Sequence, residues 1–175
     1  MPRPVWKNII VHHSATNWGT ALDIDRWHRI DRKWTCIGYH FVILNGYLTQ
    51  SDLIHRRKLE IMDGSIEAGR SLNLDQWVDV NEIGAHALGF NKNSIGICLI
   101  HKNGKHTARQ LLSLLALLRE LKKRFNIKTK NILGHYEVNS KKPYCPGIDM
   151  DIIRRALDYD YDLILKYLKE GDCDV

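Results

Sequence analysis

The feature that most constrains the fold is an apolar run followed closely by a leucine-striped helical pattern. Residues 94–100, Ser-Ile-Gly-Ile-Cys-Leu-Ile, are apolar at nearly every position, which predicts a short strand buried on both faces. Thr107 with Gln110 three positions later predicts a capping box that opens a long helix. The stripe of that helix consists of Leu111, Leu114, Leu115, Leu118 and Leu121. A buried strand leading into an amphipathic helix indicates an α/β domain.

Other segments extend this pattern. Residues 8–12 predict a central strand, and Thr20 with Asp23 predicts a second helix start. The expected apolar positions of this second helix are Leu22, Ile24, Trp27 and Ile30. Residues 151–168 predict one or two terminal helices. The chain should therefore fold as a single α/β domain over residues 1–175, with a central mixed β-sheet flanked by helices.

The middle of the chain predicts a hairpin. Residues 41–44, Phe-Val-Ile-Leu, have strand character, and Asn45-Gly46 is a strong signal for a tight turn. Residues 47–68 carry further strand-like material, so we expect a second strand after the turn. The part from 51 to 62 favours an extended hairpin.

Composition fits one enzyme-sized domain. A chain of 175 residues can bury about 70% of its unfolded surface, and a hydrophobic content of 44% is ordinary for a globular protein. No signal peptide or membrane-spanning run is evident, so we expect a protein that is cytoplasmic as synthesised, monomeric and not inserted into a membrane. The cysteines are too few and too spread for a disulfide framework; they are Cys36, Cys98, Cys145 and Cys173. Cys98 is expected to be a small buried apolar residue.

The net charge of +6 has two interpretations. It could serve solubility alone, or it could attract a polyanion such as a bacterial cell wall. Nucleic acid would also be a polyanion, but no nucleic-acid-binding motif is present, and no nucleic-acid partner is expected.

Three residues from distant parts of the chain together suggest a zinc site. His12 follows the apolar residues 9–11, His135 follows the short run 131–134, and Cys145 lies in a Pro-Gly loop. Taken singly, each would more often be structural. Together they supply two imidazoles and a thiolate, and three protein ligands with an open fourth position are typical of a catalytic zinc. The open position can hold a water whose pKa the metal lowers to about 7.

The chain resembles the zinc-dependent N-acetylmuramoyl-L-alanine amidases of type 2, which are related to the peptidoglycan recognition proteins, and within them the bacteriophage cell-wall branch. The matching stretches occur in the family's order between about residues 9 and 150. They are Val11–Thr16, Gly38–Phe41, Asp63–Arg70, Gly84–Ala87, Asn91–Ile97, Gly134–Val138 and Cys145–Gly147.

The resemblance implies roles for particular residues. The zinc ligands correspond to His12, His135 and Cys145, and the catalytic tyrosine to Tyr39. Phage members have a lysine two positions before the metal cysteine. This chain has Pro143 there instead.

The neighbouring lysines are the substitutes for the missing lysine. We favour Lys142 as the group that stabilises the developing oxyanion, with Lys141 as the alternative. The other branch of the family uses a glutamate at the position of Cys98, which agrees with a phage-like enzyme. Tyr39 would orient or deprotonate the attacking water.

Roles are also expected for the remaining histidines and for two hydroxyl residues. By the resemblance His86 is expected to line the cleft, where a contact with substrate or the transition state is favoured over the alternative of a structural role. His13 and His40 should point away and serve packing, because side chains alternate along a strand. Ser14 and Thr16 should form a local turn rather than act as nucleophiles. Surface positions are expected for His28, His55, His101 and His106.

The resemblance also divides the chain. The amidase core would span about residues 8–157, with insertions at about 51–62 and 73–82 and a helical tail at about 158–175. If the family topology holds, both insertions lie near the cleft, where they are either specificity elements or a lid; as an equal alternative they are surface decoration.

The implied fold places the zinc in a cleft at one face of the sheet. The implied reaction is zinc-dependent hydrolysis of the amide between N-acetylmuramic acid and L-alanine in peptidoglycan or muropeptides. The alternative is a non-catalytic peptidoglycan-binding or regulatory protein on the same scaffold.

Overall fold

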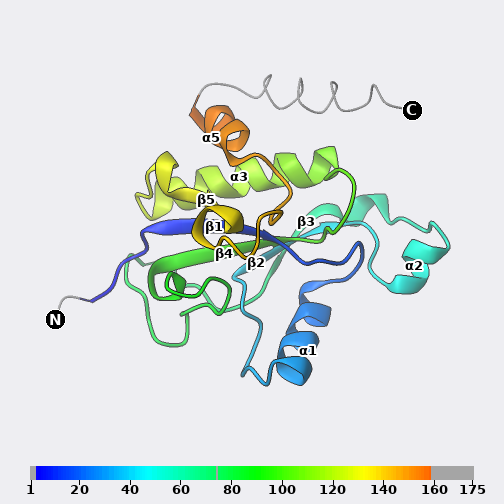
Figure 1. Ribbon diagram of the computed structural model, residues 1–175, viewed down its shortest axis with the longest axis horizontal. Coiled ribbons are helices and arrows are strands. Elements are labelled where there is room, and N and C mark those ends of the chain that lie inside the picture. Colours follow the sequence, from blue (N-terminus) through cyan, green and yellow to red (C-terminus); the bar gives the residue numbers. More distant parts are fainter. Residues whose placement is uncertain (1–2, 74, 159–175) are drawn as a thin grey trace.

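A five-stranded sheet runs through the middle of the molecule in the order β3-β2-β4-β1-β5 (Figure 1). The computed structural model describes residues 3–73 and 75–158. The strands are β1 Asn8–His13, β2 Phe41–Asn45, β3 Asp63–Ala68, β4 Ser94–Leu99 and β5 Ile132–Gly134. Strand β1 pairs in parallel with β4 and β5, β2 pairs in parallel with β4, and β3 is antiparallel to β2. The predicted mixed sheet is therefore confirmed.

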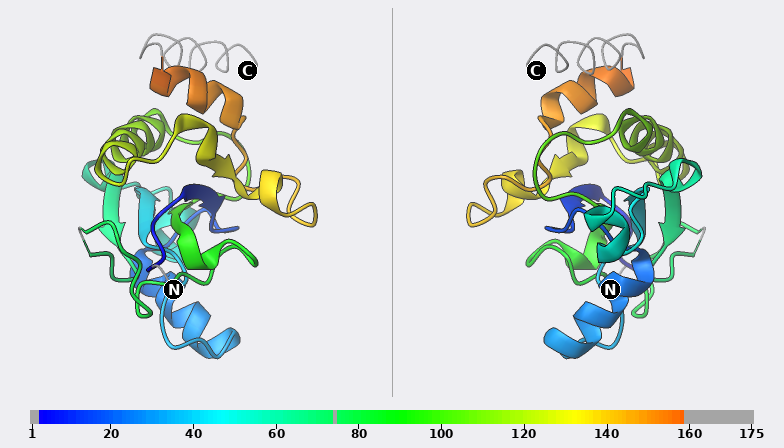
Figure 2. Two further views of the ribbon diagram at one scale, coloured as in Figure 1. Left: turned by 90° about the vertical axis from the view of Figure 1, so that its left-hand side faces the viewer. Right: turned by 90° about the vertical axis from the view of Figure 1, so that its right-hand side faces the viewer.

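Helices cover both faces of this sheet. The α-helices are α1 Ala21–Asp31, α2 Gln50–Ile54, α3 Ala108–Arg124, α4 His135–Val138 and α5 Met150–Asp158. Short 3-10 turns lie at Glu60–Met62, Asn91–Asn93 and Thr129–Asn131. Helices α3 and α5 lie on one side of the sheet and α1 on the other, as Figure 2 shows from both ends.

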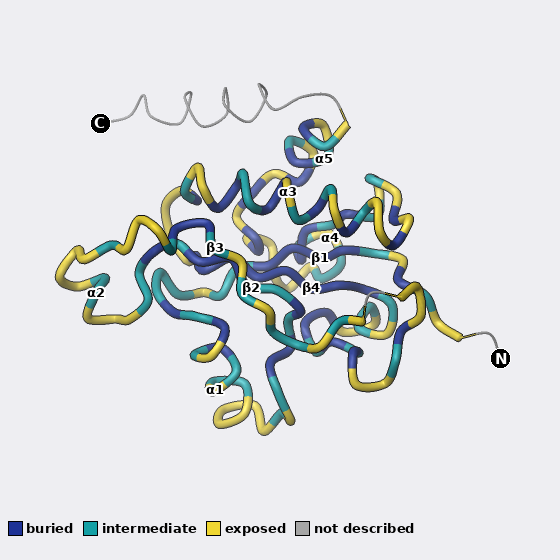
Figure 3. The backbone as a smooth tube through the Cα atoms, turned by 180° about the vertical axis from the view of Figure 1, so that it is seen from behind, coloured by how far each residue is buried: buried dark blue, intermediate teal, exposed yellow. Residues whose placement is uncertain are grey.

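Strand β4 shows why the sheet is buried on two sides. All six of its residues are buried, and their side chains alternate between the two faces. Ile97 and Leu99 pack in the core beneath α3 and α5, whereas Cys98 packs with Ile24 in the smaller core beneath α1. Figure 3 shows β1 and β4 as buried stretches in the middle of the molecule, whereas β3 at the edge of the sheet is only partly buried. The predicted buried strand and the small apolar role of Cys98 are confirmed.

Helix α3 forms as the sequence predicts. The hydroxyl of Thr107 accepts a hydrogen bond from the backbone N–H of Gln110 at 3.0 Å, and the Gln110 side chain caps Thr107 in return. The leucine stripe is entirely buried against the sheet. Burying a leucine side chain stabilises a fold by roughly 1.5–3 kcal/mol, so this stripe is a main source of stability.

Helix α1 is only partly as predicted. The capping box of Thr20 and Asp23 is present, and Ile24 is buried. Leu22 and Ile30, however, are 68% and 57% exposed. Two positions along a helix are separated by a rotation of about 200°, so Leu22 faces away from Ile24. Helix α1 therefore contacts the sheet along a narrow stripe. The prediction that Leu22 and Ile30 also lie on its buried face was wrong.

The connection between β2 and β3 corrects the hairpin prediction. Asn45 pairs with Asp63, so the strands are antiparallel neighbours, and Gly46 turns the chain with φ of 86°. Between them lie helix α2 and a 3-10 turn instead of an extended hairpin over 51–62. Thr49 and Asp52 form another capping box, which starts a helix where strand was expected.

Two further expectations concern the terminal helices and membrane-spanning segments. Of the predicted terminal helices, α5 is present, and residues 159–168 lie outside the described part of the chain, as does Cys173. Among the described helices, none has the length and apolar character needed to cross a bilayer.

Candidate metal centre

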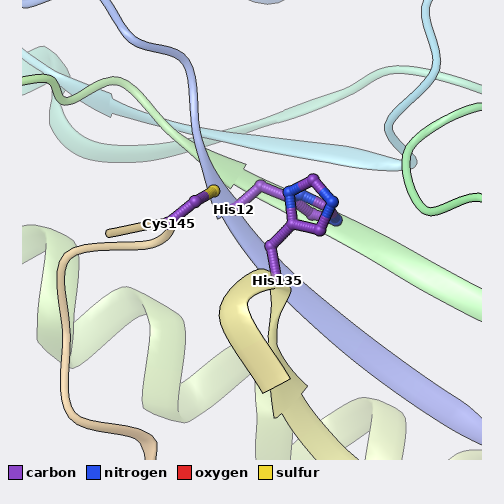
Figure 4. A group of neighbouring side chains, drawn as sticks. All are labelled: His12, His135 and Cys145. Atoms are coloured by element: carbon purple, nitrogen blue, oxygen red, sulfur yellow. The ribbon is translucent and has the colours of Figure 1, made fainter. Parts of the chain in front are cut away.

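His12, His135 and Cys145 come together at one edge of the sheet. Because β1 and β5 are parallel neighbours, their carboxyl ends meet, and His12 lies near the end of β1 while His135 directly follows β5. Cys145 reaches the same place from the loop after α4 (Figure 4). All three side chains are buried, with one potential ligand atom from each within 4.8 Å of the others.

The loop that carries Cys145 is hydrogen-bonded to the end of β1 and to helix α4, which directly follows β5. The backbone N–H of His13 donates a hydrogen bond to Sγ of Cys145 at 3.3 Å. The backbone N–H of Tyr136 donates to the carbonyl of Cys145 at 2.9 Å. These bonds hold the thiol against the ends of β1 and β5, so the three-residue group is assembled by the backbone.

The protonation states of these residues suit a metal. Burial lowers the pKa of His12 well below 6.5 and that of His135 to about 4, so both imidazoles are neutral at pH 7 and can donate a lone pair. Burial raises the pKa of the Cys145 thiol to about 11, against the opposing effects of the His13 amide and the Lys142 charge. A bound dication would favour the thiolate instead. Two neutral imidazoles and a thiolate fit zinc and leave a fourth position open.

A cleft of about 920 Å³ opens over this group. Its walls come from the turn after β1, the end of α1, the Gly84–Asn91 loop and the loop that ends at Cys145. The cations that line it are Arg32, Lys102, Lys141 and Lys142. Its described lining residues include no aspartate or glutamate, so the cleft has a positive potential that suits an anionic substrate.

Tyr39 lies beside the ligand group. It lines the cleft, and its ring centroid is 5.1 Å from that of His12. Burial raises the pKa of Tyr39 well above 10, and the nearby Cys98 and Cys145 groups act in the same direction. The phenol therefore stays protonated at neutral pH, and its side chain also has a hydrogen-bonding contact with that of Cys98.

The two candidate lysines both reach the cleft. Lys141 and Lys142 are exposed and line its wall. The positive charge of Lys142 lowers the pKa of Cys145, His135 and His13, so its ammonium acts on the ligand group. The structure thus supports the proximity required of Lys142, and its catalytic role stays a prediction.

His86 lies where it was expected, but its contacts differ. It lines the wall of the cleft and is buried. Its Nδ1 is 3.0 Å from Nε2 of His12, and its Nε2 is 3.3 Å from the carbonyl oxygen of Ser94. Both ring nitrogens thus have protein partners, which favours the structural alternative, and a contact with substrate stays a prediction.

His13 and His40 both bond to the backbone, but His13 also lines the cleft, so the prediction that it points away was wrong. Nδ1 of His13 accepts a hydrogen bond from the backbone N–H of Ala15 at 3.0 Å. Nδ1 of His40 accepts from the N–H of Gly96 at 2.9 Å, and its Nε2 donates to the carbonyl of Glu82 at 2.8 Å.

Ser14 and Thr16 form the expected turn. The two hydroxyls lie 2.9 Å apart, and the Thr16 hydroxyl donates to the carbonyl of Trp18 at 2.8 Å. Their hydroxyls are thus used in shaping the turn after β1, which forms part of the cleft wall.

The four histidines expected at the surface differ in their burial. His55 is exposed, as predicted. His101 and His106 are buried with ring centroids 3.8 Å apart, so their prediction was wrong. Nε2 of His106 donates a hydrogen bond to the carbonyl of Pro146 at 3.0 Å. This contact joins distant parts of the chain, so no local sequence pattern predicts it.

His28 is a cleft residue that the sequence analysis missed. It is half-buried, lines the cleft, and its Nδ1 accepts a hydrogen bond from the N–H of Gly38 at 3.0 Å. That bond positions the residue before Tyr39. The only available signal was its place one turn before the end of α1.

The described residues of the two supposed insertions do not line the cleft. None of the cleft-lining residues comes from 51–62 or from the described residues of 73–82. In the second segment the buried carboxylate of Glu82 accepts hydrogen bonds from the backbone N–H groups of Asp79 and Asn73. The segment is therefore folded around the carboxylate of Glu82, and the residues that line the cleft do not support a lid role for it.

Comparisons with known proteins identify the family of the chain. A profile of the family described as N-acetylmuramoyl-L-alanine amidase matches residues 1–148. The endolysin of Escherichia phage T7 is 34% identical over 153 residues, covering 81% of each chain, and that of Enterobacteria phage T3 is 33% identical over 160 residues, covering 85% of each. Among solved structures, the N-acetylmuramoyl-L-alanine amidase LysC from Clostridium intestinale is 28% identical with a TM-score of 0.66, covering 90% of this chain and 91% of that one.

Proposed function

The chain belongs to the N-acetylmuramoyl-L-alanine amidases of type 2, in the branch of the phage endolysins, and from this membership we propose a zinc-dependent reaction carried by its own cleft residues. The bond cut is the amide between the lactyl group of N-acetylmuramic acid and L-alanine of the stem peptide. Water adds across that bond, leaving a carboxylate on the lactyl group and a free amino group on L-alanine.

The observation that carries the proposal is the buried group of His12, His135 and Cys145 at the cleft. These residues would hold the zinc. When bound, the ion supplies a Lewis acid that polarises a carbonyl and makes water a nucleophile at neutral pH. Because the ligands are preassembled by the backbone, little reorganisation is needed on metal binding.

Tyr39 is the group we assign to orienting the attacking water. Its phenol remains protonated near pH 7, since burial raises its pKa, so it donates a hydrogen bond rather than acting as a free base. A fixed donor at the reacting centre contributes by holding the nucleophile in line with the carbonyl.

Lys142 is assigned to the oxyanion. Its ammonium acts on the ligand group, and a cation aimed at the oxygen that becomes negative stabilises the transition state by a few kcal/mol, which is about a hundredfold or more in rate. Lys102 and Arg32 line the same cleft and would attract the carboxylates of a stem peptide.

The reaction is tested on purified peptidoglycan and on soluble muropeptides. The protein is incubated with each substrate, with and without a chelator, and the released ends are identified by mass spectrometry. We expect new amino-terminal L-alanine on the stem peptides and intact glycan strands, with the products absent in chelator and restored by zinc.

Other outcomes would favour the rival interpretations. Cleavage inside the glycan or between stem-peptide residues would contradict the amidase assignment. Binding to wall fragments without any release would support the non-catalytic peptidoglycan-binding alternative. Full activity in the presence of chelator, in a sample shown to contain no metal, would contradict the zinc dependence but not the assignment of the bond that is cut.

A further inference from the structure

We propose that His86 is a positioning residue that fixes the tautomer and orientation of His12, so that Nδ1 of His12 faces the metal. The inference rests on the proposed zinc site and goes beyond its ligand set. It assigns to His86 a role inside the protein in place of a contact with substrate.

A chain of hydrogen bonds determines which ring nitrogens carry protons. Nε2 of His86 lies 3.3 Å from the carbonyl oxygen of Ser94, which can only accept, so this nitrogen must carry the hydrogen. The hydroxyl of Ser94 donates to the carbonyl of Phe90 at 2.8 Å, so it too can only accept from His86. Neutral imidazole has one N–H, which leaves Nδ1 of His86 as an acceptor.

The same reasoning carries the chain to the ligand. Nδ1 of His86 accepts across 3.0 Å from Nε2 of His12, so the proton of His12 is on Nε2. Its lone pair is then on Nδ1, the nitrogen left for the metal. The carbonyl of Ser94, at one end of this chain of hydrogen bonds, thus fixes the tautomers of both His86 and the candidate ligand His12.

The fold provides a slot of the size of the His86 ring. A Cβ atom at Gly84 would lie 2.5 Å from Cδ2 of His86, and one at Gly96 would lie 2.6 Å from the same atom. Atoms do not approach so closely, so any larger residue at either position would displace the ring. Glycine on both sides of His86 is therefore required by the position of its imidazole.

The backbone around the slot is also held in place. Oδ1 of Asn91 accepts hydrogen bonds from the N–H groups of His86 at 2.9 Å and Ala87 at 2.8 Å. His40 bonds to Gly96 on one wall and to Glu82 on the other. The ring of His86 therefore cannot turn without breaking contacts on several sides.

Metal-binding histidines generally donate their second N–H to a partner that fixes the ring, and loss of that partner weakens metal binding by about 10–100-fold. Here the partner is a second imidazole. We expect His86→Leu, which fills the slot without an acceptor, to weaken zinc binding by about 10–100-fold. Affinity is measured by competition with a chelator, independently of activity.

Two further variants separate positioning from general damage. In His86→Asn the side-chain oxygen lies the same number of bonds from Cα as Nδ1 does, so an acceptor for His12 is retained and zinc affinity should be largely restored. Leu114→Ala removes a buried core side chain on the far face of the sheet. It should lower the unfolding temperature of the metal-free protein while leaving zinc affinity unchanged.

The nitrogen that binds the metal provides a direct readout. Long-range proton–nitrogen NMR spectra of the zinc-loaded protein should show zinc on Nδ1 of His12 and a proton on Nε2. Zinc on Nε2, or equal zinc affinity in wild type and His86→Leu, would overturn the inference while leaving the zinc site intact. A wild-type protein that binds no zinc would overturn both proposals.

Discussion

The backbone N–H of His13 donates a hydrogen bond to Sγ of Cys145 at 3.3 Å, although the two residues are 132 positions apart in the chain. This bond links the end of β1 to the loop that supplies the thiol. Because His13 directly follows His12, the same strand end provides one candidate ligand and holds another in place. A hydrogen bond to sulfur also favours the thiolate, the form that binds metal.

Removal of Cys145 should abolish metal binding and keep the fold. In Cys145→Ala two imidazoles remain, too few for a stable zinc site, so zinc content should fall to near zero and activity with it. Metal analysis of the purified variant, with circular dichroism for the fold, provides the measurement. One zinc per chain in Cys145→Ala would refute the ligand assignment.

Tyr39→Phe should separate chemistry from metal binding. The variant removes only the hydroxyl, so zinc content and fold should be those of the wild type while turnover falls by about 100-fold or more, as for other lost transition-state donors. Steady-state kinetics on a soluble muropeptide measure the effect. Turnover near the wild-type value would exclude Tyr39 from orienting the water.

Lys142 and Lys141 form a matched pair for testing the oxyanion role. Lys142→Ala should lower turnover by roughly tenfold to a thousandfold with zinc retained. Lys141→Ala should be close to neutral, although both lysines line the cleft. A severe loss confined to Lys141→Ala would reverse the assignment, and equally mild effects would mean that neither lysine is needed.

Acid should destabilise the metal-free protein because of its buried histidines. Burial lowers the pKa of His40 to about 4 and those of His86 and His106 to about 3. Below pH 6.5 the unfolded chain takes up protons that the folded chain does not, so stability falls with decreasing pH. At pH 5.0 each such group costs about 2 kcal/mol.

Urea unfolding of the metal-free protein at pH 7.5 and 5.0 measures this loss. His106→Leu should reduce the loss of stability between these two pH values by about 2 kcal/mol, the contribution of that one group. Identical unfolding midpoints at the two pH values would contradict the contribution of buried histidines.

Local sequence patterns sufficed for elements whose burial depends on their own periodicity. Strand β4 and the leucine stripe of α3 were predictable, because an apolar run or a 3.6-residue stripe specifies its own buried faces. The capping boxes at Thr20 and Thr107 were also readable, since a cap bonds only to residues a few positions away. The candidate ligands were found through short stretches shared with a known family.

Tertiary structure decided the features that depend on what packs against each element. The burial of His101 and His106, and the exposure of Leu22, follow from which surfaces meet, and a single periodic pattern carries no information about the opposing surface. The two contacts of the His86 ring were hidden for the same reason. The sequence by itself determined the buried strand β4, the caps of α1 and α3, and the residue types of the candidate ligand group. The order of the strands was decided by the tertiary structure, which places β1 beside β5 and so brings His12 and His135 to one edge of the sheet. Residues so distant in sequence meet only when the chain between them has folded.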